Sequence, residues 1–340
     1  MQKATLWRRL LRSRTTLLLL VLIVFTLVVI VVRSGVLDGA PFSAMLTSGF
    51  MSRGNLYNIF LNLIIQCIMI CGLSCLLIGG NIDLSVAGQA TLAALIFAKI
   101  CSGTSIPWVA ALVAALMFGV FCGLINTFLI NFLRFPPFIA TIGMSSIYSG
   151  LSNIWTGSGN VQITRAGFLA VGEMSVGVFP VLFLFALVLM ALYQFILLKT
   201  PLGRKVYMVG GNIHAARLSG MNPKRVRMML LINNSVLASF AGLTWSTRSK
   251  LASPTAIISA GPDMRVISAA ILGGVMFQGG SGDIGGAFVA ILLLNVFQNI
   301  LDVLSVPPYW NVVAQGALLI LALILDYFNA ERQRKILQPH

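Results

Sequence analysis

The chain has 340 residues, of which 58% are hydrophobic and only 9% charged, and its formal net charge is +15 at pH 7. This composition excludes an ordinary soluble domain, because most side chains must be solvated by lipid or by each other. It predicts an integral membrane protein. In such a protein the cationic residues set topology and meet lipid headgroups, so the positive charge does not indicate nucleic-acid binding.

Apolar runs of about 20 residues predict helices that cross the bilayer, since backbone polar groups in lipid must be bonded within the chain. We therefore expect a single all-α polytopic domain over residues 1–340, with about ten transmembrane helices. Their approximate cores are 16–32, 56–78, 86–101, 108–132, 136–156, 178–198, 228–245, 264–278, 286–304 and 309–328. The first run is long and no cleavage signal follows it, which favours an uncleaved helix over a secretory signal.

The distribution of lysine and arginine predicts the orientation of these helices. Cytoplasmic loops collect cations, and placing both termini in the cytoplasm puts most of the 23 lysines and arginines on the inner side. The largest inner group lies in residues 199–227, which interrupt the apolar pattern. We expect this segment to be a cytoplasmic loop that meets a partner.

The sequence lacks the motifs of a self-contained enzyme. It has no Gly-x-x-x-x-Gly-Lys-[Ser/Thr] loop, no His-Glu-x-x-His and no Gly-x-Ser-x-Gly. We expect no catalytic residue and no bound cofactor. Cys67, Cys71 and Cys75 share one helical face, which would suit a soft metal, but no histidine or carboxylate accompanies them. Close helix packing is the favoured interpretation, with no metal site.

Asp83 is one of eight acidic residues and lies in an interruption between two apolar runs, Gly79-Gly80-Asn81-Ile82-Asp83-Leu84-Ser85. The glycines permit an unwound backbone. We expect Asp83 and Ser85 to cap the following helix by accepting its free N–H groups. Such a broken helix is also how transporters shape a passage, so capping and a functional role are compatible.

The basic loop 199–227 contains a predicted short helix. Asn212 is a good N-cap, Gly220 a good C-terminal residue, and Pro223 prevents continuation into the next span. A short, capped helix outside the membrane is suited to insertion into a groove of a partner protein. The alternative is a solvated loop that merely follows the positive-inside rule.

Four motifs occur in an order that identifies a family. They are Gly-Gly-x-Ile-Asp-Leu-Ser-Val at 79–86, Pro-Pro-Phe-Ile-Ala-Thr-Ile-Gly at 136–143, Gly-Arg-x-x-Tyr-x-x-Gly-Gly-Asn-x-x-Ala-Ala-Arg-Leu-Ser-Gly at 203–220, and Leu-Gly-Gly…Gly-Gly-x-Gly-x-x-Gly at 272–285. Across residues 56 to 328 the chain resembles a permease subunit of the ribose-type bacterial ABC sugar importers.

The resemblance implies a complex in the bacterial cytoplasmic (inner) membrane. Two permease subunits, identical or different, would form one pathway with a cytoplasmic ABC ATPase, which uses ATP and Mg²⁺, and an extracytoplasmic sugar-binding protein. Transport of a monosaccharide would proceed by alternating access. The segment 212–220 would be the coupling helix against the ATPase. The coupling residues that follow are Asn212, Ala215, Ala216, Arg217 and Gly220.

A passage that bound sugar tightly would not release it, so we expect a weakly polar lining. The candidate pathway residues are Asn62, Gln66, Asn81, Asp83, Ser85, Asn126 and Thr141. For Asn62, Gln66, Asn81, Asn126 and Thr141, hydrogen bonding between helices is an equal alternative.

A departure from the family pattern loosens the inference of substrate. Arg265 stands where the family usually carries a second acidic residue after that at Asp263, which would alter docking of the binding protein or indicate a heterodimer. Glu173, in the outer loop 157–177, either pairs with the binding protein or is solvated.

A nucleoside or another small polyhydroxylated solute is an alternative cargo. An ion-coupled secondary transporter using Asp83 and a receptor subunit without flux are alternative classes.

Overall fold

The computed structural model describes residues 14–33, 49–307 and eight positions between 309 and 324. Its long helices are α2 (Arg14–Arg33), α4 (Arg53–Ile78), α5 (Val86–Gly103), α6 (Trp108–Thr127), α7 (Pro137–Thr156), α9 (Val181–Lys199), α12 (Pro223–Ser249) and α15 (Ile284–Val303). The shorter helices are η2 (Gly49–Met51), the π-helical η3 (Phe128–Phe132), α8 (Ala166–Glu173), α10 (Pro201–Gly211), α11 (Ile213–Leu218), α13 (Ala256–Ala260) and α14 (Pro262–Leu272).

Six of the described helices are long and apolar enough to cross a membrane. They are α4, α5, α6 together with η3, α9, α12 and α15. Two of them are largely exposed on the surface of the subunit, since only 28% of the apolar window of α6 with η3 and 22% of that of α9 is buried. The helical membrane architecture is confirmed, whereas the described residues do not confirm about ten spans.

Two of the predicted spans, 264–278 and 136–156, lie outside this set for physical reasons. The run 264–278 forms α14, whose 11 residues extend about 16 Å before Gly273 and Gly274 end the helix. The run 136–156 forms α7, which carries many hydroxyl side chains and is less apolar. The first run forms the apolar 20-residue helix α2, at the predicted position. Most of 309–328 lies outside the described residues, as do both termini, for which we predict a cytoplasmic location.

The structure adds two short sheets to the all-α architecture that we predicted. β1 (Val161–Gln162) pairs antiparallel with β4 (Leu251–Ala252), and β2 (Ser175–Val176) pairs with β3 (Phe179–Pro180). Beside them, the Nζ atom of Lys250 lies 2.7 Å from an Oε1 of Glu173. Glu173 is therefore engaged within the chain, and this exposed ion pair contributes little to stability.

Helix α4 is the centre of the molecule. Every residue from Leu63 to Ile78 is buried, and α4 packs against α12, α15, α9 and α14. Glycines allow the closest approaches between helices. A Cβ atom added to Gly242 of α12 would lie 2.0 Å from the carbonyl oxygen of Ala90 in α5, so only glycine fits there.

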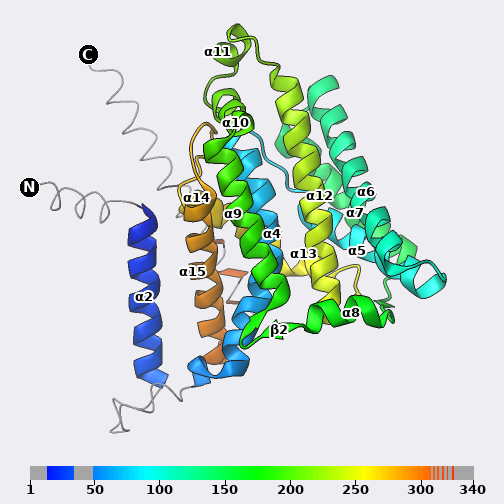
Figure 1. Cartoon of the computed structure of the whole chain (residues 1–340), viewed down its shortest axis with the longest axis vertical. Helices are drawn as coiled ribbons and strands as arrows, with labels where there is room; N and C mark the ends of the chain where they lie inside the picture. The colour runs from blue at the N-terminus through cyan, green and yellow to red at the C-terminus, as the bar shows by residue number, and fades with distance from the viewer. Residues whose placement is uncertain are drawn as a thin grey trace, which may run out of the picture.

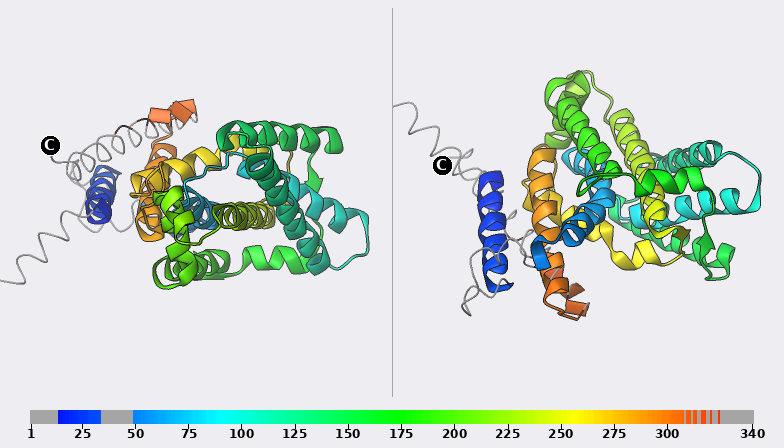
Figure 2. Two further views of the ribbon diagram at one scale, coloured as in Figure 1. Left: turned by 90° about the horizontal axis from the view of Figure 1, so that it is seen from above. Right: turned by 60° about the horizontal axis from the view of Figure 1, so that its bottom comes forward.

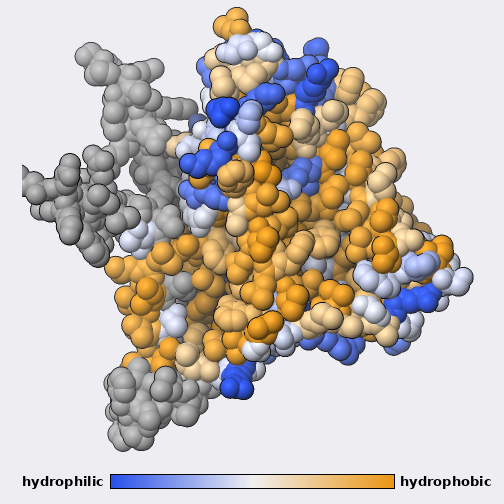
Figure 3. Space-filling model, in the orientation of Figure 1, coloured by the Kyte–Doolittle hydropathy of each residue, from blue (hydrophilic) through white to orange (hydrophobic). Residues whose placement is uncertain are grey.

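The two ends of the helical bundle differ in character. Figure 1 shows α11 at the top of the molecule, at the opposite end from α8 and β2. Helix α2 lies at one side of the bundle next to α15 in each view (Figures 1 and 2). Hydrophobic residues form a broad belt between polar ends (Figure 3). The positive-inside rule predicts that the basic end, which carries α10 and α11, is the inner end.

Candidate functional site

A buried carboxylate lies where the chain unwinds between α4 and α5. Gly80 adopts a φ of +72° just after α4 ends, and α5 begins only at Val86. Within this segment Asp83 is 0% exposed. Its Oδ1 atom accepts hydrogen bonds from the backbone N–H of Ser85 (2.8 Å) and from the Ser85 hydroxyl (2.5 Å).

Amides from three helices complete this site. Asn126 of α6 donates to Asp83 Oδ2 (3.3 Å) and to Ser85 Oγ (3.1 Å), and Asn234 of α12 donates to Asp83 Oδ2 (3.1 Å). Gln89 of α5 donates to Ser85 Oγ (2.6 Å). These five residues, here called the Asp83 cluster, tie the unwound segment to α5, α6 and α12. A carboxylate that accepts several hydrogen bonds is stabilised in a buried position.

The capping role expected for Asp83 and Ser85 is wrong in detail. Ser85 is the N-cap residue of α5, but its side chain accepts no hydrogen bond from the helix backbone. Asp83 accepts the N–H of Ser85 itself, which precedes the helix. Both side chains are instead engaged by Asn126, which lies about 40 residues away in the sequence.

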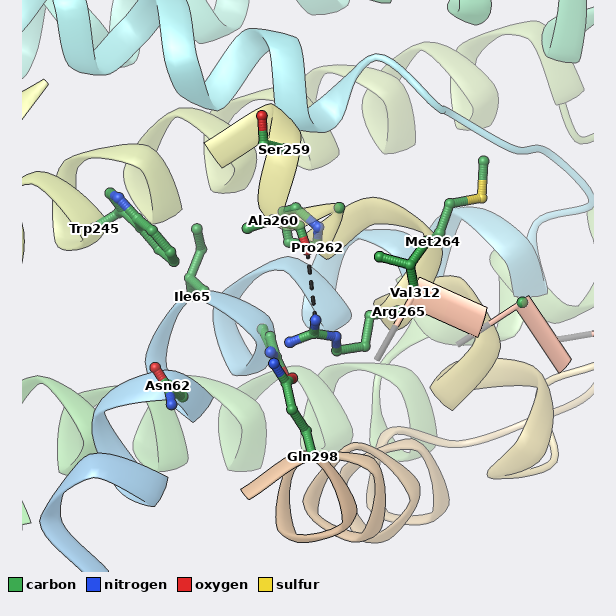
Figure 4. A pocket seen from close by; sticks show the side chains of 13 residues that line it. Asn62, Ile65, Trp245, Ser259, Ala260, Pro262, Met264, Arg265, Gln298 and Val312 are labelled. Carbon is green, nitrogen blue, oxygen red and sulfur yellow. Dashed lines mark hydrogen bonds between the residues drawn. The ribbon is translucent and has the colours of Figure 1, made fainter. Parts of the chain in front are cut away.

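Two of the candidate pathway residues line a cavity of about 540 Å³ in the half of the molecule away from α11. Asn62 and Gln66 reach it from α4, and Arg265 at the start of α14 lies on its wall (Figure 4). The remaining lining residues are Ile65, Trp245, Ser259, Ala260, Gly261, Pro262, Met264, Gln298, Val312 and Gly316. We call this the Arg265 cavity; its volume is in the range of about 300–1,000 Å³ that small-molecule sites occupy.

The other candidates do not line this cavity. Asp83, Ser85 and Asn126 lie together in the Asp83 cluster. Asn81 is buried, and its side-chain amide donates to the carbonyl oxygen of Gly79 (2.9 Å). Thr141 is 0% exposed, and its hydroxyl donates to the carbonyl oxygen of Pro137 in its own helix (2.9 Å). Arg265, Trp245 and Gln298 are lining residues that we did not select as pathway residues from the sequence, because only the folded chain brings α12, α14 and α15 together.

The short helix in the basic loop forms as predicted. The Asn212 side chain accepts from the backbone N–H groups of His214 and Ala215 (both 3.0 Å), and Gly220 follows the helix with a φ of +76°. Ala215 and Arg217 are exposed. Ala216 differs from the expectation, because it is only 1% exposed and packs inward. Leu218, which we did not select, is 91% exposed.

The loop also contains α10, which we did not predict. Thr200 caps it by accepting from the N–H of Gly203 (3.3 Å), and Pro201 occupies its first turn. At its far end, a Cβ atom on Gly210 would lie 1.8 Å from the carbonyl oxygen of Ile78, the last residue of α4. The N–H of Gly280 donates to that same oxygen (2.7 Å).

These contacts form a junction of three backbones. The C-terminal end of α10, the end of α4 and the loop before α15 touch without side chains between them. We call the residues Ile78, Gly210 and Gly280 the glycine junction. At this junction α10, which precedes α11 in the chain, contacts the C-terminal end of α4. The unwound residues that include Asp83 follow directly after this end of α4.

The cysteines are consistent with the packing interpretation. Cys67, Cys71 and Cys75 are buried free thiols on α4, and the Cys71 thiol donates to the carbonyl oxygen of Cys67 (3.2 Å). Among the described residues, no group of three or more histidine, cysteine or acidic side chains could hold a metal ion.

A bundle of apolar helices around a broken, polar centre defines a multi-pass membrane protein of the transporter class. The family model described as branched-chain amino acid transport system / permease component matches residues 55–323. The chain belongs to this permease family. It is a membrane permease, located in the bacterial cytoplasmic membrane as the sequence predicts.

Similar proteins include permeases with named cargoes. The chain is 30% identical to the autoinducer 2 import system permease protein of Salmonella typhimurium (strain LT2), over 84% of this chain and 81% of that protein. It is 29% identical to the D-allose transport system permease protein of Escherichia coli (strain K12), over 84% and 87%. It is 30% identical to the ribose import permease protein of the same strain, over 83% and 88%. No solved structure gives a significant match. The resemblance to permeases of ribose-type importers is confirmed.

Proposed function

We propose that the chain imports a monosaccharide as one permease subunit of a binding-protein-dependent ABC importer. A separate cytoplasmic ATPase would use ATP and Mg²⁺, and an extracytoplasmic sugar-binding protein would deliver the cargo. The permease itself would bind no cofactor and would catalyse no reaction alone. The observation that carries this proposal is the match over residues 55–323 together with relatives that serve D-allose and ribose import.

The proposed topology has ten spans with both termini in the cytoplasm, in one domain whose coupling loop is 199–227. The basic residues of this loop at the α11 end support that orientation. Two such subunits, identical or different, would enclose the pathway. Closure of the ATPase would push α11, and the glycine junction would pass the displacement to α4 and the Asp83 cluster. The candidate pathway residues would then face the passage in one of its two states.

The cargo rests on the named relatives. The family description mentions branched-chain amino acids, but D-allose and ribose are sugars, which favours a hydroxyl-rich solute. A nucleoside or other polyhydroxylated solute would fit a weakly polar passage equally well. Ion-coupled transport is less supported. Asp83 is 0% exposed and bonded on both carboxylate oxygens, whereas a coupling carboxylate has to exchange its ion with water.

The proposal predicts that α11 is essential for transport. Arg217 and Leu218 are both exposed on α11, which leaves an arginine and an apolar side chain available to a groove of the ATPase. Arg217→Glu and Leu218→Asp should each reduce ATP-dependent uptake of labelled ribose at least about tenfold in proteoliposomes holding the full complex. Arg225→Glu is the matched control, because it reverses an exposed charge in the same loop outside α11.

The assay also separates the alternative classes. Uptake should require the ATPase, the binding protein and this chain together. Uptake that continues without the ATPase and stops with a protonophore would contradict the proposal and favour an ion-coupled transporter. Partner binding without any flux would indicate a receptor or assembly subunit.

A further inference from the structure

The described residues that line the Arg265 cavity carry a positive charge and no negative charge. Arg265 is the only charged residue among the described residues that line it, which include three side-chain amides, those of Asn62, Gln66 and Gln298. Two of these amides already use their oxygen atoms. Asn62 Oδ1 accepts from Arg248 (2.5 Å), and Gln66 Oε1 accepts from Asn295 (2.5 Å). Their NH₂ groups make no hydrogen bond within the described residues, so donors predominate on this wall.

The guanidinium of Arg265 has most of its hydrogen-bonding capacity free. Its Nη2 atom makes one long hydrogen bond to the carbonyl oxygen of Ala260 (3.5 Å), and its buried Nε atom has no partner among the described residues. A guanidinium has five N–H donors, and a buried donor without a hydrogen-bond partner is costly. Figure 4 shows this group beside Gln298.

No carboxylate among the described residues lines the Arg265 cavity. Asp302 lies close enough to attract Arg265 electrostatically, but it does not line the cavity. Between described residues, the only ion pair is that of Lys250 with Glu173. The cavity therefore has room for an anionic oxygen pair next to Arg265, and the side-chain amides and the Trp245 ring also line it.

We propose that the Arg265 cavity receives a solute that carries a carboxylate, namely a sugar acid, and that Arg265 is the residue that selects it over the neutral sugar. A carboxylate matches the planar fork of a guanidinium, and such charge-assisted pairs are stronger than hydrogen bonds to a neutral hydroxymethyl group. The cavity leaves space for the hydroxyl-bearing ring beside the amides. This inference extends the proposed import of a monosaccharide by naming its chemical class.

The first test measures binding to the full-length chain in detergent. Equilibrium dialysis compares labelled D-galacturonate with D-galactose, which differ only at the sixth carbon, at matched ionic strength in sodium chloride. We expect the affinity for galacturonate to be at least about tenfold higher. The preference should disappear in Arg265→Gln and persist in part in Arg265→Lys, which keeps the charge but loses the fork.

Arg53→Gln is the matched control, since Arg53 is exposed at the start of α4 and does not line the cavity. It should keep the full preference. Each variant is accepted only if its size-exclusion profile and Tm match the wild-type protein. Equal affinities for the two sugars, or no binding of galacturonate, would overturn the inference. So would a preference that survives Arg265→Gln.

The second test uses the reconstituted complex. It distinguishes failure of the sugar-acid inference from failure of the proposed importer function. ATP-dependent import without preference for galacturonate would overturn the sugar-acid inference and leave the importer intact. Galacturonate binding that depends on Arg265, without ATP-dependent import of any sugar, would leave the cavity assignment and overturn the proposed function. If Arg265→Gln instead weakens stimulation of the ATPase by the binding protein and leaves both sugar affinities unchanged, the cavity receives a carboxylate of that protein, which also contradicts our assignment.

Discussion

Replacement of Asp83 by alanine is expected to destabilise the protein by about 3 kcal/mol and to abolish transport. The carboxylate accepts four hydrogen bonds, and its loss leaves the amides of Asn126 and Asn234 without their acceptor. Buried donors without a partner each cost about 1–3 kcal/mol. Thermal unfolding of the purified chain in detergent should show a Tm that is lower by about 5 °C.

A second buried polar residue provides the control for this experiment. Thr141 is also 0% exposed, but its hydroxyl donates only within α7, to Pro137. Thr141→Val should therefore change stability by less than about 1 kcal/mol. Asp83→Asn should behave like the alanine variant, because an amide offers a donor where Asn126 or Asn234 already donates. A wild-type Tm in Asp83→Asn would contradict the proposed role of the cluster.

The sequence allowed local features to be predicted more reliably than contacts between distant segments. The cap of α11 was predictable because Asn212 bonds N–H groups only two and three residues ahead. Helix α10 carries an equally local signal, Thr200 followed by Pro201, which could have identified it. We missed it because the many charges and glycines of the loop indicated turns.

The Asp83 cluster could be predicted only in part. The glycines before Asp83 correctly indicated an unwound segment, but Asn234 is 151 residues away and sits in an apolar helix like many others. A buried carboxylate has to find donors somewhere, yet nothing local to it identifies which helix provides them. For this reason we predicted a helix cap, whereas in the folded chain the Asp83 cluster connects the unwound segment with α5, α6 and α12.

The same limit applies to the Arg265 cavity. Arg265 was conspicuous in the sequence because it replaces an acidic residue that is usual in the family, but its neighbours in the fold could not be named. Its neighbours Trp245 and Gln298 come from α12 and α15, and α14 proved too short to be the expected span. The residues that line such a cavity depend on where each helix ends, and helix boundaries are the feature that a sequence predicts least reliably.

The glycine junction supplies the second prediction of large effect. Gly210→Ala should reduce ATP-dependent uptake at least about tenfold and lower the Tm, even though alanine favours a helix over glycine by about 1 kcal/mol. The added methyl group would lie 1.8 Å from the carbonyl oxygen of Ile78 and 2.7 Å from the nitrogen of Gly280. Backbone atoms cannot rotate away as a side chain can, so α10 has to separate from α4.

Gly211, the next residue in the chain, provides the matched control for Gly210→Ala. Gly211 lies in the same helix, and its added Cβ atom would lie 3.8 Å from the nearest atom, the Cα of Gly280. Gly211→Ala should therefore preserve uptake and keep or slightly raise the Tm, since only the helix preference remains. If both variants transport normally, α10 does not transmit motion through this contact. If Gly210→Ala retains the basal ATPase activity of the complex but loses uptake, the defect lies in the coupling between α11 and the central helix, as the glycine junction requires.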